Sequence, residues 1–244
     1  MKLAWTDVQR STQANVGLGV TLSFVAGATN AGGFLAVGTY TSHMTGVVSA
    51  LADNMALGHW SLIWISVASF VAFLLGAMTT AWMVNWSLRR NLRSAFGRPL
   101  LLEALLLLVF GLFGAVIDAH GILFVPFTVL LLCFIMGLQN AVITKISKAE
   151  IRTTHITGLV TDLGIELGKL LYYNGQTPNQ PQVLANRQKL GIQSKLIGSF
   201  FVGAVCGAVG FKTAGYIATI PLSMALVLLV WRPVLYDVRV WWKS

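Results

Sequence analysis

Long apolar runs separated by short polar segments occupy most of this chain. Six of the runs are long enough to cross about 30 Å of hydrocarbon as helices that rise about 1.5 Å per residue. They lie near residues 16–38, 61–86, 99–118, 122–144, 193–212 and 215–232. Tryptophans flank the second run at both ends, as in the aromatic belts of membrane helices, at Trp60, Trp64, Trp82 and Trp86. The pattern predicts an all-α polytopic membrane protein, with residues 1–244 forming a single membrane domain of six transmembrane helices.

Two more segments, 41–57 and 153–172, have helical patterns but make poor spans. The first is short and carries Asp53 and Asn54, and the second carries Asp162, Glu166 and Lys169. If only one of them were a span, the Lys and Arg residues would no longer fall mainly on one side of the membrane. Counting both would put the N-terminus and loop 87–98 on opposite sides of the membrane. We therefore expect each segment to be a re-entrant or interfacial helix.

The composition and the charge agree with a membrane protein. The chain is 56% hydrophobic and 10% charged, whereas soluble domains are about 25% charged. A net charge of +9 would suggest a nucleic-acid partner in a soluble protein, but here basic residues keep loops in the cytoplasm and no nucleic acid is expected. With six spans, only Lys212 of the 17 Lys and Arg residues falls on the external side. Both termini are thus predicted to be cytoplasmic. The first fifteen residues lack the apolar core of a secretory signal, so no cleaved segment is expected.

The chain contains an internal repeat. F-V-A-G-A-T-N-A at 24–31 matches F-I-M-G-L-Q-N-A at 134–141, and S-H-M-T-G at 42–46 matches T-H-I-T-G at 154–158. The repeats cover about 16–118 and about 122–232, and three spans separate their starts, so the second copy is expected to be inverted. Two inverted three-span repeats with interrupted helices are typical of transporters that bind solute near the midplane, although such repeats also serve as scaffolds.

The repeat blocks also carry a resemblance to a known family. GATNAGGFLAVGTYTSHMTGVVSALADN and IMGLQNAVITKISKAEIRTTHITGLVTDLGIELGK resemble the YoaK family, a broad set of bacterial six-span membrane proteins classed as a domain of unknown function. The resemblance covers nearly the whole chain and implies a bacterial inner (plasma) membrane location, but no substrate or activity. Two positions depart from the family pattern: Asn30, where members often have aspartate, and Val47, where asparagine often follows M-T-G.

Two asparagines inside spans occupy equivalent repeat positions, Asn30 and Asn140. Polar groups at membrane depth need a partner or a function. In one interpretation the two amides coordinate one small polar ligand across the pseudo-two-fold axis. In the other, each amide bonds the free carbonyls of an interrupted helix, and each such hydrogen bond stabilises the fold by roughly 1 kcal/mol. Both interpretations stay open from the sequence.

Each short helix begins with an H-φ-T-G block, comprising His43, Thr45 and Gly46 in one copy and His155, Thr157 and Gly158 in the other. A histidine changes charge near neutral pH, which suits a gate or a proton-coupled step; the alternative is a ring bonded to loop carbonyls. The preceding hydroxyl residues are expected to be N-caps: Thr41, Ser42, Thr153 and Thr154. A capped helix start attracts anions.

Carboxylates near these blocks are few, so neither a metal site nor a cofactor is expected. Asp162 is the nearest candidate, and it shares one face of a cytoplasmic helix with Glu166, which Lys169 could pair. Glu103 follows Arg98 by five residues and is expected to reach the membrane interface. Phosphate-binding glycine loops, H-E-x-x-H, nucleophile elbows and C-x-x-C are all missing from the sequence, which argues against an enzyme or an ATP-driven pump.

The sequence therefore predicts a transporter or channel for a small polar or anionic solute, passive or proton-coupled. Its midplane site would comprise Asn30, Asn140 and the two H-φ-T-G helix starts, with His43 and His155 nearer the gates. One alternative is a membrane-embedded enzyme or lipid-binding protein that uses the cytoplasmic face of the segment 153–172, including Asp162. A second alternative is an assembly scaffold. The expected partners are the solute and the lipid bilayer, and a small six-span bundle is also compatible with a homodimer.

Overall fold

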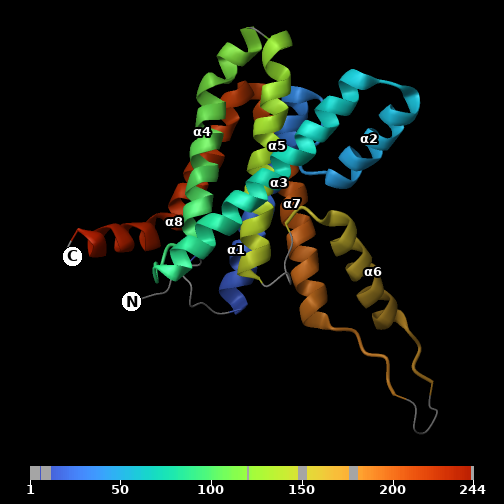
Figure 1. Cartoon of the computed structure of the whole chain (residues 1–244). Coiled ribbons are helices and arrows are strands. Elements are labelled where there is room, and N and C mark those ends of the chain that lie inside the picture. The colour runs from blue at the N-terminus through green and yellow to red at the C-terminus, as the bar shows by residue number, and fades with distance from the viewer. Residues whose placement is uncertain (1–5, 7–11, 120, 148–152, 176–180, 243–244) are drawn as a thin grey trace.

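The chain folds as a bundle of long helices with two shorter helices at its side (Figure 1). The computed structural model describes residues 6, 12–119, 121–147, 153–175 and 181–242. Within them the elements are α1 (Thr12–Val37), α2 (Met44–Leu57), α3 (Trp60–Arg89), α4 (Gly97–Ala119), α5 (Gly121–Ile146), α6 (Ile156–Leu171), α7 (Arg187–Ala214), the 3-10 turn η1 (Gly215–Ala218) and α8 (Thr219–Trp241). All eight predicted helices are present; α7 begins six residues before its predicted segment, and α8 ends nine residues after its own. The prediction of an all-α protein is confirmed.

Four segments among the described residues are long and apolar enough to cross a membrane. They are Gln13–Val37, Trp60–Arg89, Pro126–Ile146 and Arg187–Val240. The last segment is 54 residues long and contains α7, η1 and α8. A polytopic membrane protein is therefore supported, and the total of six spans stays a prediction. Residues 148–152, which precede the segment 153–172, lie outside the described residues, as do residues 1–5, 7–11 and 243–244.

The bundle is built from three principal helix pairs. α1 packs along α7, α3 packs along α5, and α4 packs along α8, so each pair joins the first half of the chain to the second. α2 lies against α3 and α6 lies against α7, at the side of the bundle (Figure 1). α2 buries none of its residues, and it ends at Gly58, whose φ of 71° places it in the left-handed region that favours glycine.

Glycines bring the paired helices to backbone contact at two crossings. A Cβ atom added to Gly27 of α1 would lie 2.1 Å from the carbonyl oxygen of Phe200 in α7, and one added to Gly203 would lie 2.1 Å from that of Phe24. The α3–α5 crossing repeats this arrangement, with Gly137 on the Phe73 carbonyl and Gly76 on the Phe134 carbonyl, each at 2.1 Å. All four helices thus cross through an F-x-x-G sequence, as expected for close packing through small residues in membranes.

Hydroxyl groups join α4 to α8. Ser223 donates from Oγ to the carbonyl oxygen of Ala104 at 2.6 Å, and Thr219 donates from Oγ1 to that of Leu107 at 2.9 Å. Both side chains are buried. Apolar residues of α1, α4, α5 and α8 form the core around these bonds.

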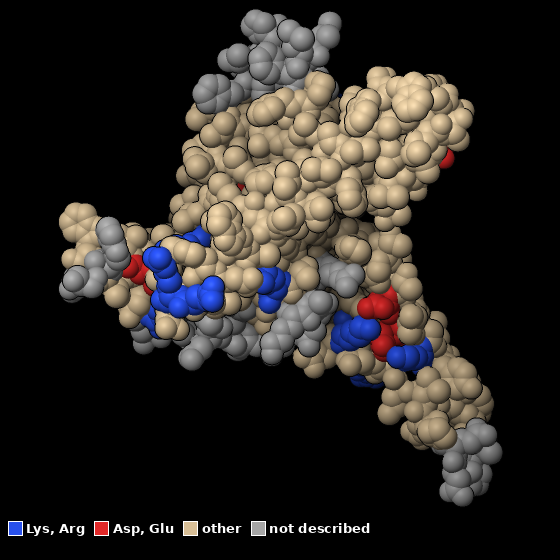
Figure 2. All heavy atoms as spheres, viewed as in Figure 1, with Lys and Arg blue, Asp and Glu red and all other residues tan. Residues whose placement is uncertain are grey.

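Charged side chains gather at one end of the molecule. Figure 2 shows Lys and Arg mainly on the lower half of the visible face, around the ends of α3 and α8 and beside α6. Arg90 and Arg98 both stack on the ring of Trp86, at 4.3 and 5.1 Å from its centre. Near them the carboxylate of Asp237 in α8 accepts the backbone N–H groups of Arg93 and Ser94, at 3.1 and 2.8 Å. The end of α8 thus holds the turn that leads into α4.

Candidate functional site

Asn30 lies near the end of α1, where its amide holds the segment that leads into α2. The Oδ1 atom accepts hydrogen bonds from the hydroxyl of Ser42 at 2.9 Å and from the backbone N–H of Ser42 at 3.3 Å. Asn30 is buried, and Ser42 is partly buried. The bond fixes the position of the chain just before His43.

Asn140 has the equivalent arrangement in the second half of the chain. Its Oδ1 atom accepts a short hydrogen bond from the hydroxyl of Thr154, just before His155. Its Nδ2 group donates to the carbonyl oxygen of Met136 one turn earlier in α5, at 2.8 Å. In both copies the asparagine oxygen therefore bonds a hydroxyl of its own repeat. The ligand-binding role of the two amides stays a prediction.

The hydroxyl residues before α2 and α6 do not cap these helices, so the N-cap prediction is wrong. The N-cap positions are His43 and His155, and neither side chain makes a capping hydrogen bond. Ser42 and Thr154 donate to the asparagines instead. The hydroxyls of Thr41 and Thr153 are buried and have no hydrogen-bond partner among the described residues, and the same holds for Ser23 and Thr29 inside the bundle. The helices begin later than the sequence pattern indicates because the asparagines engage the hydroxyls first.

The two H-φ-T-G blocks differ in where they place the histidine. A Cβ atom added to Gly46 would lie 2.2 Å from Cδ2 and 2.7 Å from Nε2 of His43, so this ring covers the glycine. Gly158 has no such neighbour within 4 Å, so His155 does not cover it. Both histidines are exposed, as are Thr45 and Thr157. The blocks match in sequence and in their asparagine links, but not in the histidine contact.

Asp162 lies on the side of α6 that faces α7. Its Oδ2 atom accepts a hydrogen bond from Nε2 of Gln193 at 3.1 Å and forms an ion pair with Nζ of Lys189 at 3.2 Å. Asp162 thus links α6 to α7. It is not brought to the asparagines by any contact that the structure gives.

Glu166 anchors the linker between α6 and α7. Its Oε2 atom accepts the backbone N–H of Asn186 at 2.7 Å, and its Oε1 atom pairs with Nζ of Lys169 at 2.9 Å, which confirms the predicted pair. The residue is only 3% exposed. The linker folds back over this side chain, which the helical spacing alone does not reveal.

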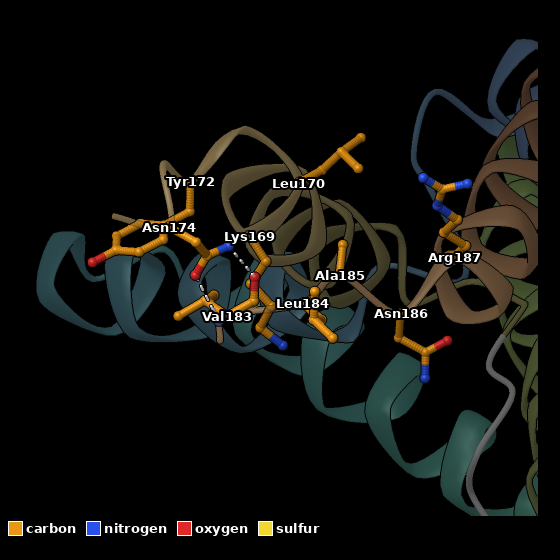
Figure 3. A pocket seen from close by; sticks show the side chains of 9 residues that line it. All are labelled: Lys169, Leu170, Tyr172, Asn174, Val183, Leu184, Ala185, Asn186 and Arg187. Carbon is orange, nitrogen blue, oxygen red and sulfur yellow. Dashed lines mark hydrogen bonds between the residues drawn. The ribbon is translucent and has the colours of Figure 1, made fainter. Parts of the chain in front are cut away.

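A shallow pocket lies beside this anchor, where α6 meets the linker (Figure 3). Asn174 and Val183 close one side through two hydrogen bonds, at 3.0 and 2.8 Å. Lys169 and Arg187 contribute cationic side chains to the lining. The pocket shares no residue with the predicted solute site.

The anchor should weaken in acid. The backbone N–H of Asn186, followed by the Lys169 ammonium group, lowers the pKa of Glu166 from its ordinary value of 4.5. Because the folded-state pKa is the lower one, the stabilisation is fully present above the ordinary pKa and is lost as the pH falls through the lowered value. We expect hydrogen-exchange protection of the Asn186 amide, corrected for the intrinsic rate, to drop between about pH 6 and about pH 3. Glu166→Gln should remove this pH dependence, and Asp53→Asn on α2 should preserve it; the same drop in Glu166→Gln would contradict the assignment.

The side chain of Glu103 does not reach the surface of the bundle, as the prediction of an interfacial carboxylate required. The residue is 0% exposed, and neither carboxyl oxygen has a hydrogen-bond partner among the described residues. Arg98 cannot serve as its counter-ion because Nε of Arg98 donates to Oγ of Ser94 at 3.2 Å and its guanidinium covers Trp86. The sequence did contain a signal for this buried position, because Glu103 lies inside a leucine-rich run and more than one helical turn from either end of it.

Gln139 was not predicted from the sequence as a candidate functional residue, although it lies beside Asn140 in the repeated block. It is 0% exposed, and both its Oε1 and Nε2 atoms lack a partner among the described residues. Those residues contain no group of three or more His, Cys, Asp or Glu side chains that could hold a metal ion.

Comparison with known proteins assigns the chain to a family. The model of a family described as "Protein of unknown function (DUF1275)" matches residues 18–231. The "UPF0700 transmembrane protein YoaK" of Bacillus subtilis (strain 168) is 25% identical over 159 residues, which cover 64% of this chain and 68% of that protein. No solved structure matches. The family model covers most of the chain, including both Asn-linked helix starts, and the resemblance seen in the repeat blocks is confirmed. This helical membrane protein therefore belongs to the DUF1275 family.

Proposed function

We propose that this chain is a transporter or channel for a small polar or anionic solute, built from two inverted three-span repeats. One observation carries the proposal: the first helix of each repeat makes the same contact with the corresponding helix of the other repeat. The crossing of α1 with α7 has the same F-x-x-G contacts as the crossing of α5 with α3. Exchanged contacts of this kind are expected when two copies are related by a two-fold axis in the membrane plane.

The asparagine links support a solute path between the repeats. Asn30 and Asn140 each fix the start of a short helix, through Ser42 and Thr154. The first amides of such helices attract anions, and irregular backbone at membrane depth is tolerated where it lines a cavity. The proposed site thus comprises the two asparagines and both H-φ-T-G blocks, in a bacterial inner membrane with both termini in the cytoplasm.

The alternative of a one-sided enzyme or lipid site on α6 has less support. The carboxylates of Asp162 and Glu166 are both engaged in linking α6 to α7 or to the linker. A general acid or base would have to leave these partners before it could act. The pocket next to them is open and shallow (Figure 3).

Flux through reconstituted protein tests the proposal. In proteoliposomes screened with neutral polar solutes and small anions, with and without a pH gradient, we expect solute-dependent flux from the unaltered protein. Asn30→Ala and Asn140→Ala should each reduce it at least about tenfold, because each loses the bond that holds a helix start. Asn85→Ala, an exposed asparagine on α3, is the matched control. Absence of flux across the panel, or unchanged flux in both variants, would overturn the proposal.

Cysteine labelling tests the orientation. Single cysteines at Thr39 and Gln182, both exposed, are introduced after Cys133 and Cys206 are replaced by alanine. A membrane-impermeant thiol reagent should label the first position only from outside and the second only from inside, because basic loops stay cytoplasmic. Labelling of both positions from one side contradicts the topology.

A further inference from the structure

Glu103 and Gln139 lie at the same depth on neighbouring helices. α4 and α5 contact each other and run in opposite directions (Figure 1). Glu103 precedes the end of α4 at Ala119 by 16 residues, or about 24 Å of helix. Gln139 follows the start of α5 at Gly121 by 18 residues, or about 27 Å. The two side chains are therefore within about one helical turn of each other in depth.

The two residues also lie on the same helix faces as two members of one buried cluster. Phe110 and Leu132 belong to one buried cluster. Glu103 lies seven residues before Phe110, and Gln139 lies seven residues after Leu132. Seven residues are close to two full turns, so Glu103 and Gln139 lie on the same sides of their helices as this pair. These spacings turn both polar groups toward the side of α4 and α5 that contributes to the buried cluster.

Among the described residues, no charged group forms a hydrogen bond or an ion pair with the carboxyl group of Glu103. The neighbouring Ala104 carbonyl is bonded by Ser223 of α8, which is flanked by the buried Leu222 and Leu226. The ionisable residues on the described elements packed against α4 are Arg89 on α3, Cys133 and Lys145 on α5, Tyr216 in η1, and Arg232, Tyr236, Asp237 and Arg239 on α8. None of these donates a hydrogen bond to Glu103.

We propose that Glu103 is an exchangeable proton-binding site inside the bundle, held there as the neutral acid. A buried carboxylate without a counter-ion or donor is strongly disfavoured. The neutral acid has one O–H donor and one carbonyl acceptor and needs no counter-ion, and in the structure it is not bonded to the amide of Gln139. Ca²⁺ and Mg²⁺ take six or more oxygen ligands, whereas the side chains of Glu103 and Gln139 supply three. The proton is the ligand that this chemistry fits.

If the chain transports a solute as proposed, the proton bound at Glu103 is the coupling ion. Only this coupling role rests on the proposed function. Proton binding itself is measurable without any solute. Its failure and the failure of transport are therefore distinguishable.

Infrared spectroscopy of one isotopically labelled carboxyl group tests proton binding. The chain has three glutamates, Glu103, Glu150 and Glu166. In a Glu150→Gln, Glu166→Gln variant grown with ¹³C-carboxyl glutamate, Glu103 is the one labelled glutamate. At neutral pH we expect the carbonyl band of a protonated carboxylic acid, shifted in D₂O because the proton exchanges. Glu103→Gln in this background should lack the band and keep the fold, because glutamine has the shape of the neutral acid.

Each outcome bears on the proposal. A carboxylate band at neutral pH, or an acid band that does not shift in D₂O, overturns the proton-binding site even if solute flux is present. An exchangeable acid band without flux of any solute supports the proton site and overturns transport. Where flux is found, the Glu103→Gln protein should lose its dependence on the pH gradient, and retained dependence overturns the coupling role. Should Glu103→Gln not fold, the band of the unaltered Glu103 still decides.

Discussion

Replacing Gly203 by alanine is expected to lower the free energy of unfolding by about 3 kcal/mol, an overpacking cost at the upper end of the usual range. The added Cβ atom would lie 2.1 Å from the carbonyl oxygen of Phe24 and 2.8 Å from its carbonyl carbon. These are backbone atoms of α1, so no side chain can rotate out of the way. α1 and α7 would have to separate along the principal contact between the halves.

Gly198 provides the matched control on the same helix, because no atom of another element lies within 4 Å of its Cβ position. Gly198→Ala should leave stability unchanged or raise it by up to about 1 kcal/mol, since alanine favours a helix over glycine. Gly76→Ala at the second crossing should behave as Gly203→Ala does, because its Cβ would meet the Phe134 carbonyl at 2.1 Å. Unfolding in detergent mixtures, followed by circular dichroism, measures all three variants. Equal stability of Gly203→Ala and Gly198→Ala would contradict the close crossing.

Asp237→Ala is expected to lower the free energy of unfolding by about 2 to 4 kcal/mol, because two backbone N–H groups lose a charged acceptor. Asp237 is 8% exposed, and its two oxygens accept separately from Arg93 and Ser94. Water cannot fully replace the carboxylate at such a buried position. The turn before α4 would then detach from the end of α8.

Asp237→Asn separates charge from hydrogen bonding. Asparagine keeps one acceptor oxygen, so we expect about half of the loss seen with alanine. Asp53→Ala, at an exposed position of α2, should stay within about 0.5 kcal/mol of the unaltered protein. The same unfolding measurement serves, and hydrogen exchange at the amides of Arg93 and Ser94 locates the effect. Unchanged protection of both amides in Asp237→Ala would show that the contact is dispensable.

The predicted helices followed from local pattern alone. Uninterrupted apolar runs have few polar groups that favour another conformation, and the helix satisfies its own backbone hydrogen bonds in a membrane. Glycines such as Gly58 and the change to polar residues mark the ends. The repeat blocks were likewise visible as letters, and each retains its asparagine link in the structure.

Contacts between helices did not follow from the pattern. The F-x-x-G sequence around Gly27 is part of the repeat, but its partner Phe200 lies in a helix whose rotation and depth the sequence does not specify. The N-cap prediction failed for a related reason. A hydroxyl at a helix start has several possible acceptors or donors within reach, and Asn30 is brought to Ser42 only by the turn between α1 and α2.

The sequence by itself determined that this is a helical membrane protein, where its helices lie and which blocks repeat, because apolar run length and residue identity are local quantities. Only the tertiary structure decided that Glu103 and Gln139 are buried with no hydrogen-bond partner in the part of the chain that it describes. In a membrane span both faces of a helix are apolar, so the pattern does not distinguish the lipid-facing side from the packed side. A polar residue on such a helix becomes a candidate for function once its neighbours are known, and those neighbours belong to other helices.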